Sequence, residues 1–446
     1  MKLLKLKNLW VITSFIIFLG IWVSCTKENQ ILDVPTINNS TDLISIKIAT
    51  PPTIDGIIDP IWDSAAKLKA VPQVPDAGNG LFAGYIGTQY PVTFRSMYDD
   101  NNIYFLAEWA DANQSVQVQP WYFNPTTKRW AQEPSARTFD VNGNLTREGW
   151  GEDKLAMLWN IDNSTAKFAS LTCYASCHLF TAYLDPTTTP ATMKPNQSAN
   201  HYTNGANEKI DMWWLKIGRD PIYSQFSDEY QDWGGGPTYS SLVGGSANGR
   251  HQDDQVVTGV ASTTYPFGPT YSANAAGTGT SNNTQTLTIT GSSPAISVSV
   301  PKYVIPGKAD YYYILQTEVD NATAKLVTAV DANGVLTLSG GTMIDPNTGT
   351  DYQRKGDPVT GGDGPKIIPS YISAPLTKGR ADITCMVVYT GTGWIVEWKR
   401  ALKTTDNLKQ DIDFSSLSDQ PFGMAIFNKS NYQHGIKPNL LLKFKK

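Results

Sequence analysis

Alternation of apolar and polar residues at every second position is the strongest constraint on the fold of this chain. Successive side chains of a β-strand point to opposite faces, so this alternation predicts half-buried strands. Residues 92–98 and 103–109 show it on either side of Asp99-Asp100-Asn101-Asn102, which predicts a β-hairpin. Long helical patterns are absent, and Gly, Pro, Asn and Thr are frequent. We therefore expect an all-β protein, an antiparallel β-sandwich with long loops and few short helices.

Further strands are expected along most of the remaining chain. A tight turn at Thr390-Gly391-Thr392-Gly393 predicts a second hairpin. The stretch 233–299 is rich in Gly, Ser, Thr and Asn, and we interpret it as an insertion or long surface loop with one peripheral strand at 284–290. The other expected strands are residues 44–48, 154–161, 311–319, 383–389, 393–399, 422–427 and 440–444.

The N-terminal sequence predicts an export signal. Three lysines precede an apolar run of about fifteen residues, which is shorter than the roughly 20 that a membrane-spanning helix needs. The run ends at Ser24-Cys25, the pattern at which a bacterial lipoprotein signal is cut and the new N-terminal cysteine is lipidated. We expect a signal peptide at 1–24, a lipid on Cys25, and a tether over 25–44, with an uncleaved anchor helix as the alternative. The protein would be held at the outer membrane, on its periplasmic face or at the cell surface.

Composition and motifs exclude several classes of function. The net charge of −4 and the lack of a basic patch argue against a nucleic-acid partner. The sequence has no G-x-S-x-G elbow, no H-E-x-x-H helix and no phosphate-binding loop, so we expect no independent enzyme. Only four cysteines and four histidines occur. Their scarcity makes the cluster of Cys173, Cys177 and His178 conspicuous, while Cys385 lies in a strand pattern and reads as a buried, inert thiol.

This cluster has the spacing C-x-x-x-C-H, one residue longer than the C-x-x-C-H of covalent c-type haem attachment. Such attachment uses two thiols for the haem vinyl groups and a following histidine for the iron. Two alternatives remain open at this point. Cys173 and Cys177 could form a small disulfide loop, or the cluster could bind zinc or copper with His201 as a further ligand.

Four further segments, 151–161, 208–216, 393–402 and 422–428, are followed by His434. In this order they resemble the ethylbenzene-dehydrogenase-type haem-binding domain, also called the cytochrome c-552/DMSO reductase-like haem-binding domain. The earlier segment 53–62, Thr-Ile-Asp-Gly-Ile-Ile-Asp-Pro-Ile-Trp, looks like the first strand of a family-9 carbohydrate-binding module. The resemblance covers roughly 45–446 and implies one haem-binding β-sandwich domain.

The resemblance implies a haem that exchanges electrons with a partner redox protein or oxidoreductase complex. Family dehydrogenase subunits hold b-type haem through Met and Lys, whereas the C…CH segment here favours c-type haem, with Cys173 and Cys177 as thioethers and His178 on the iron. Met193 is the first candidate for the second axial ligand. Trp214 stands where the family often has a histidine. The alternative axial ligands are His434, Met424 and Lys216.

The sequence therefore predicts a haem-binding electron-transfer lipoprotein that is not an enzyme in its own right. The alternative is a cell-surface carbohydrate-binding lipoprotein without haem. That alternative is motivated by the 53–62 segment and by the 13 tryptophans and 21 tyrosines, whose rings could stack on sugars.

Overall fold

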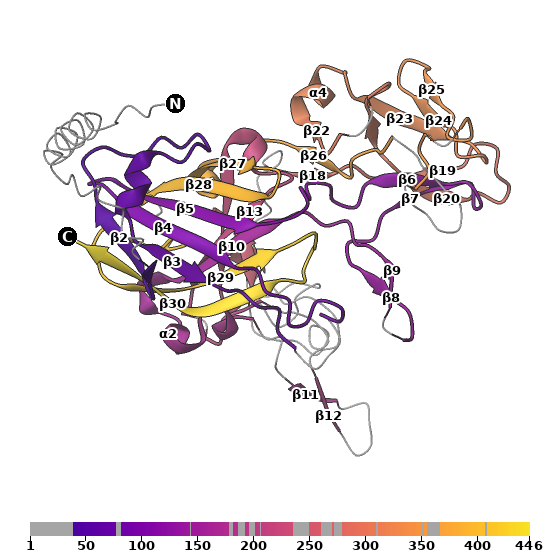
Figure 1. Ribbon diagram of the computed structural model, residues 1–446. Helices are drawn as coiled ribbons and strands as arrows, with labels where there is room; N and C mark the ends of the chain where they lie inside the picture. The colour runs from indigo at the N-terminus through magenta and orange to yellow at the C-terminus, as the bar shows by residue number, and fades with distance from the viewer. Residues whose placement is uncertain are drawn as a thin grey trace, which may run out of the picture. The chain divides into compact units, whose positions relative to one another are not determined.

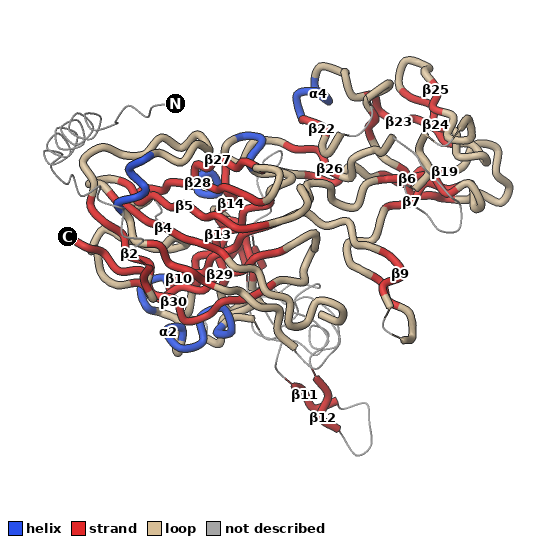
Figure 2. The backbone as a smooth tube through the Cα atoms, in the orientation of Figure 1, coloured by secondary structure: helices blue, strands red, loops and turns tan. Residues whose placement is uncertain are grey.

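The chain is mostly β-structure, as predicted, with a few short helices (Figures 1 and 2). A computed structural model describes residues 39–76, 82–142, 144–177, 182–185, 192–195, 201–205, 207–234, 249–259, 270–271, 279–308, 311–349, 351–354, 366–405 and 408–446. Asn39–Lys446 forms one compact unit. Among the residues described, no helix is long and apolar enough to span a bilayer.

The main sheet closes on itself instead of forming two stacked layers. Ten strands follow one another around the ring, and the first and last, β4 and β5, also pair with each other. The predicted sandwich is therefore wrong in its architecture, because a closed ring leaves no free edges between two sheets. In ring order the strands are β4 (Val92–Tyr98), β2 (Leu43–Lys47), β30 (Gly435–Lys445), β29 (Gln420–Phe427), β10 (Lys154–Asn160), β13 (Ile210–Lys216), β14 (Gln225–Gln231), β27 (Ile383–Tyr389), β28 (Gly393–Ala401) and β5 (Asn102–Ala110).

Most neighbours in the ring are antiparallel, and β2 is the exception. It lies parallel to both β30 and β4 and so joins the two ends of the chain. Three further strands extend the sheet outside the ring. They are β3 (Lys67–Ala70) on β4, β1 (Asn39–Ser40) on β3, and β15 (Arg250–Gln252) on β14.

The predicted hairpin at 92–109 is confirmed. Residues of β4 and β5 pair from Val92↔Trp109 to Tyr98↔Ile103. The turn between them is held by Asp99, whose Oδ1 accepts the backbone N–H groups of Asn101 and Asn102 at 2.8 and 2.7 Å. A short acidic side chain thus satisfies the turn backbone, as expected for an Asx turn.

Aromatic side chains fill the inside of the ring. Phe105 and Trp398 stack with centroids 5.1 Å apart, and Trp159 stacks on Phe422 at 4.9 Å. Trp213 lies 5.0 Å from Trp159, and all five side chains are fully buried. Because one such ring stabilises the fold by about 1.5–3 kcal/mol when removed from water, this cluster is the main source of stability.

A second hydrophobic core lies outside the ring. Its members include Trp121, Phe123 and Trp130 from the 121–132 segment and a set of valines and leucines from 298–338. From the stretch 233–299, expected to be an insertion or long surface loop with one strand, Ile289 is buried in this core, and Leu287 and Val298 pack against it. The strands around it are β6 (Trp121–Asn124), β7 (Arg129–Gln132), β18 (Ser281–Asn282), β19 (Gln285–Thr288), β20 (Ser297–Val300), β21 (Tyr303–Val304), β22 (Ile314–Leu315), β23 (Lys325–Val330), β24 (Leu336–Leu338), β25 (Met343–Ile344) and β26 (Tyr371–Ser373).

The remaining elements are short. The described residues form five two-stranded ribbons. Three of them are β8 (Thr138–Phe139) with β9 (Leu145–Arg147), β11 (Ala182–Asp185) with β12 (Thr192–Pro195), and β16 (Val257–Gly259) with β17 (Thr270–Tyr271); the other two are β6 with β7 and β19 with β20. The helices are α2 (Phe168–Leu171) and α4 (Gln316–Asp320), with 3-10 turns η1 (Pro60–Ser64), η2 (Ile161–Asn163), η3 (Thr172–Ala175), η4 (Pro221–Tyr223) and η5 (Lys378–Ala381).

Two local expectations are wrong. The 311–319 segment contains only the two residues of β22 before α4 begins, because its apolar residues pack into a small satellite cluster. The 53–62 segment is a loop that ends in η1, not a strand. Glu397 of β28 holds that loop by accepting the backbone N–H of Gly56 at 2.8 Å and the indole N–H of Trp62 at 2.9 Å.

Candidate functional site

The cysteine segment packs on the outer face of the ring. Cys173 lies in η3 and Cys177 follows it, with the N–H of Cys177 donating to the Cys173 carbonyl at 2.9 Å. No disulfide joins the two sulfurs, so the structure does not contain the alternative disulfide. Burial raises the pKa of Cys173 to about 12, which keeps that thiol protonated and unreactive at neutral pH. The backbone of Cys177 pairs with that of His201 in an isolated β-bridge. The histidine considered as a further zinc ligand therefore lies beside Cys177 in the fold.

The described residues include only some of the proposed axial ligands, so this prediction stays untested. His178 lies outside the described residues, and Met193 is in β12 with its side chain also outside them. Met424 of β29 is 2% exposed and belongs to the core inside the ring. Lys216 of β13 forms ion pairs with Glu229 and Asp220, at Nζ–oxygen distances of 3.1 and 3.6 Å.

His434, another proposed axial ligand, contacts an aromatic ring and a backbone carbonyl. Its ring stacks on Phe427 with centroids 4.4 Å apart, and its Nδ1 lies 2.6 Å from the Tyr432 carbonyl. Desolvation lowers the pKa of His434 to about 4, so the imidazole is neutral at physiological pH. Cys385 is buried in β27 and donates to the Gln225 carbonyl, which confirms the prediction of an inert thiol.

Three cationic side chains surround one indole on the outer face of β10, β13 and β14. Arg250 lies 3.5 Å from the centroid of the Trp214 ring, with Lys216 at 5.0 Å and Lys154 at 5.7 Å. Glu229 of β14 neutralises part of this charge through both N–H groups of Arg250, at 2.9 and 2.8 Å. Burial opposes ionisation of Glu229, but the Arg250 and Lys216 charges outweigh it and lower its pKa to about 2.

Lys154 is the most deeply buried of these cations, at 1% exposure. Its ammonium donates to the carbonyls of Ser430 and Asn431 at 3.1 and 2.9 Å, and lies 5.1 Å from the Phe427 ring. Desolvation lowers the pKa of Lys154 to about 7. The β29–β30 loop is therefore fixed onto β10 by a lysine that is close to its titration point at neutral pH.

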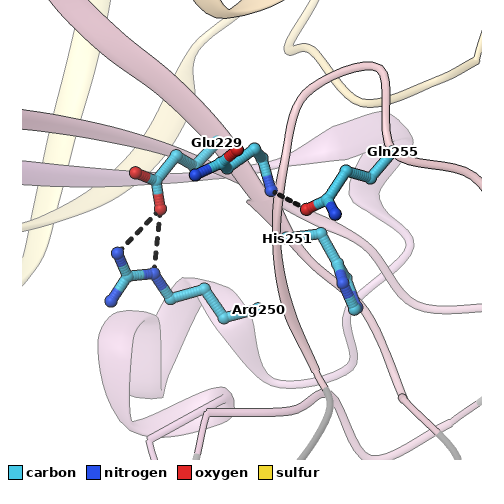
Figure 3. A pocket seen from close by; sticks show the side chains of 5 residues that line it. Glu229, Arg250, His251 and Gln255 are labelled. Atoms are coloured by element: carbon cyan, nitrogen blue, oxygen red, sulfur yellow. Dashed lines mark hydrogen bonds and ion pairs between the residues drawn. The ribbon is translucent and has the colours of Figure 1, made fainter. Parts of the chain in front are cut away.

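A polar pocket of about 380 Å³ opens beside this cation cluster (Figure 3). It is lined by Glu229, Arg250, His251, Gln252 and Gln255. The Gln255 amide oxygen accepts the N–H of Gln252 at 2.9 Å, and the lining Glu229 is the ion-pair partner of Arg250 (Figure 3).

His251 is held in the pocket by two neighbours. Its Nε2 lies 3.1 Å from Asp232 Oδ1, and its ring packs 5.2 Å from Tyr230. Sequence reasoning missed this pocket because it treated residues from 233 onward as surface loop, whereas β15 places Arg250 and His251 in the main sheet.

Residues 59–438 match the ethylbenzene dehydrogenase family. The chain belongs to the ethylbenzene dehydrogenase family. This match confirms the family predicted from the ordered segments. It corrects two other expectations, because the family is that of an enzyme: the prediction of a non-enzymatic protein and that of a haem protein for electron transfer are both wrong. The carbohydrate-binding alternative is not supported by the match either.

Other comparisons add little. No curated protein matches the chain. Two solved structures of a family-9 carbohydrate-binding module from Caldicellulosiruptor kristjanssonii, with glucose and with cellotriose, share 10% identity and a TM-score of 0.24 with it. Both cover 90% of this chain, and the alignments span 95% and 93% of the respective modules. Similarity at this level supports no conclusion about binding.

The haem assignment is also corrected, because the family points to a molybdenum-type cofactor instead. The part of the chain that the structure describes does not fit such a group. A molybdenum–pterin cofactor needs a large cavity with free donors for its phosphate and ring, but the 380 Å³ pocket has its one guanidinium committed to Glu229. The carboxylate triad found among the described residues, Asp211, Asp228 and Asp411, is buried and offers acceptors only.

Proposed function

We propose that this chain is a subunit of an exported dehydrogenase complex whose cofactor is held by a partner protein. Membership of the ethylbenzene dehydrogenase family across residues 59–438 is the observation that carries the proposal. A dehydrogenase removes electrons and protons from its substrate and must deliver the electrons to an acceptor. Since the described residues do not fit the cofactor implied by the family, the proposal assigns the redox chemistry to a partner chain.

The lining of the polar pocket supports the assignment of the cofactor to a partner chain. Its lining groups are charged or amide side chains, which would bind a small polar molecule and would not favour a hydrocarbon such as ethylbenzene. Oxidation of an apolar substrate is therefore assigned to the partner. The contribution of this chain is a closed sheet with three cationic side chains, partly neutralised by Glu229, gathered around Trp214.

The N-terminal sequence supports a place outside the cytoplasm. Three lysines, an apolar run and Ser24-Cys25 form a lipoprotein signal, and residues 25–44 are polar enough to act as a tether. The proposal therefore places the complex at the outer membrane through acyl chains on Cys25.

The proposal is tested by purifying the complex from its native host through a C-terminal tag on the full chain, after mild cross-linking. Molybdenum content and reduction of an artificial electron acceptor are then measured for the complex and for the chain expressed alone. We expect both signals in the complex and neither in the isolated chain. One molybdenum per isolated chain would refute the assignment of the cofactor to a partner. A chain that purifies without partner and without dehydrogenase activity would refute the function itself.

The anchor is tested separately with Cys25→Ser. We expect the parent chain to incorporate radiolabelled palmitate and to sediment with membranes, and the variant to do neither. A parent chain that incorporates no palmitate, or a Cys25→Ser chain that still incorporates it, would contradict lipid anchoring through Cys25.

A further inference from the structure

Four charged side chains meet at one end of the interior of the ring. Asp211 of β13, Asp228 of β14 and Arg400 of β28 point inward beside the aromatic core, and Asp411 joins them from the segment that follows β28. Asp211 and Asp228 are 0% exposed, Arg400 is 1% exposed and Asp411 is 8% exposed. Charges are almost never buried this deeply unless they are neutralised by a partner or a metal ion.

The guanidinium of Arg400 does not balance the three carboxylates. It lies 2.7 Å from Asp411, but 3.4 Å from Asp211 and 3.4 Å from Asp228. Three negative charges against one positive charge leave a formal charge of −2, if all three acids are ionised. A single divalent cation would bring this enclosed group to neutrality.

The oxygens of Asp228 provide an independent observation. Neither Oδ1 nor Oδ2 of Asp228 has a hydrogen-bond donor, although the side chain is fully buried and points into the cluster. Asp211 Oδ1 is in the same situation, while its Oδ2 accepts the N–H of Ile412 at 2.8 Å. Unsatisfied buried acceptors of this kind destabilise the folded state unless a cation, a water molecule or a proton satisfies them.

The spacing suits a hard cation. One oxygen from each of Asp211, Asp228 and Asp411 lies within 4.8 Å of the other two. Calcium binds oxygens at about 2.3–2.6 Å, so two ligands on opposite sides of one ion are about 4.6–5.2 Å apart. Magnesium demands near-ideal octahedral geometry at about 2.0–2.1 Å, whereas calcium accepts the irregular geometry of carboxylates from separate segments.

From this geometry we propose that Asp211, Asp228 and Asp411 form a structural calcium site that closes one end of the ring. The site ties β13 and β14 to the segment around Asp411. It does not depend on the proposed dehydrogenase role, and its test uses no activity measurement.

Trp213 provides a direct reporter for the ion. Its indole ring lies 5.3 Å from the Cζ atom of Arg400, so a terbium ion bound to the triad would be within range of energy transfer from tryptophan. The experiment uses the full chain in detergent at pH 8, stripped with EGTA. Terbium luminescence excited through tryptophan is titrated and then competed with calcium, and the melting temperature is measured with and without calcium.

We expect one calcium-competable terbium site, a rise in melting temperature with calcium by mass action, and at least tenfold weaker binding in Asp228→Asn. Asp413→Asn is the matched control. Asp413 lies in the same segment, but it pairs with Lys403 at 3.0 Å and its side chain is 40% exposed, so binding should be unchanged.

The competing explanation is that a shared proton neutralises the carboxylates. In that case the parent chain would show no sensitised luminescence and no change in melting temperature with millimolar calcium at pH 8, which would overturn the proposal. Equal binding by Asp228→Asn and the parent would also overturn it. The comparison of the parent chain in calcium and in EGTA needs no variant, so the proposal remains falsifiable if Asp228→Asn does not fold.

Discussion

Replacing Arg400 with methionine should destabilise the fold more than any surface substitution. The guanidinium is the one positive charge that the structure places among Asp211, Asp228 and Asp411, and it also donates to the Ile412 carbonyl at 2.9 Å. Methionine has nearly the same length and would fill most of the volume. The loss would therefore be electrostatic, because three buried carboxylates would remain without a counter-charge.

The expected loss follows from the burial of the cluster. Removing one partner of a buried charged group costs about 3–5 kcal/mol, because the remaining charges cannot be solvated. This is a large part of the roughly 5–15 kcal/mol that stabilises a typical protein. Arg400→Met should therefore lower the free energy of unfolding by about 3–5 kcal/mol at pH 8 in EGTA.

The loss should also depend on pH. Burial, with the nearby charges, raises the pKa of Asp211 to about 7, and burial raises that of Asp228 well above its usual range. Between about pH 4 and 7 the folded state holds a proton on Asp211 that the unfolded state has lost. The resulting stability is present at low pH and disappears as the pH rises through 7. Protonation compensates for the missing guanidinium, so Arg400→Met should be less harmful at pH 5 than at pH 8.

Urea unfolding followed by tryptophan fluorescence measures both effects, with the parent and variant compared at pH 5 and pH 8. Lys403→Met is the control, because its ion pair with Asp413 is exposed and worth at most about 1 kcal/mol. The cluster would not be charged as described if Arg400→Met lowered the free energy of unfolding by less than about 1 kcal/mol at pH 8. An equal loss at pH 5 and pH 8 would lead to the same conclusion.

Three further outcomes are expected. Gly151→Ala would place a Cβ 2.3 Å from the backbone of Ser430 and should cost about 1–3 kcal/mol in urea unfolding, whereas Gly205→Ala, whose nearest neighbour would be 3.6 Å away, should stay within about 0.5 kcal/mol. Trp159→Ala should cost about 3–5 kcal/mol by creating a cavity in the ring, and a smaller loss would mean that the core collapses around it. Since the pKa of Lys154 falls to about 7 in the folded state, the unfolded state binds the extra proton between pH 7 and 10.5. The free energy of unfolding of the parent should therefore rise with pH across that window, and it should rise less in Lys154→Met. The same pH dependence in both chains would contradict the lowered pKa of Lys154.

The sequence by itself determined the kind of local structure. Alternation at period two requires only neighbouring residues, so it identified the strands at 92–98, 383–389 and 422–427 and the Asp99 turn. The ordered segments around 151–161, 208–216 and 393–428 were enough to identify the family. Where alternation was replaced by a short apolar run, at 311–319, the same reasoning failed because a satellite cluster supplied the packing.

Only the tertiary structure decided how the strands close and which charges meet. Closure depends on the parallel pairing of β2 with β30, strands from opposite ends of the chain, and local alternation carries no information about such a pairing. The same is true of Asp211, Asp228, Arg400 and Asp411, which lie on separate elements and come together only when β13, β14 and β28 take their places in the ring. Spacing along the chain can place residues on a face, but the charge balance of a buried site depends on contacts between distant segments.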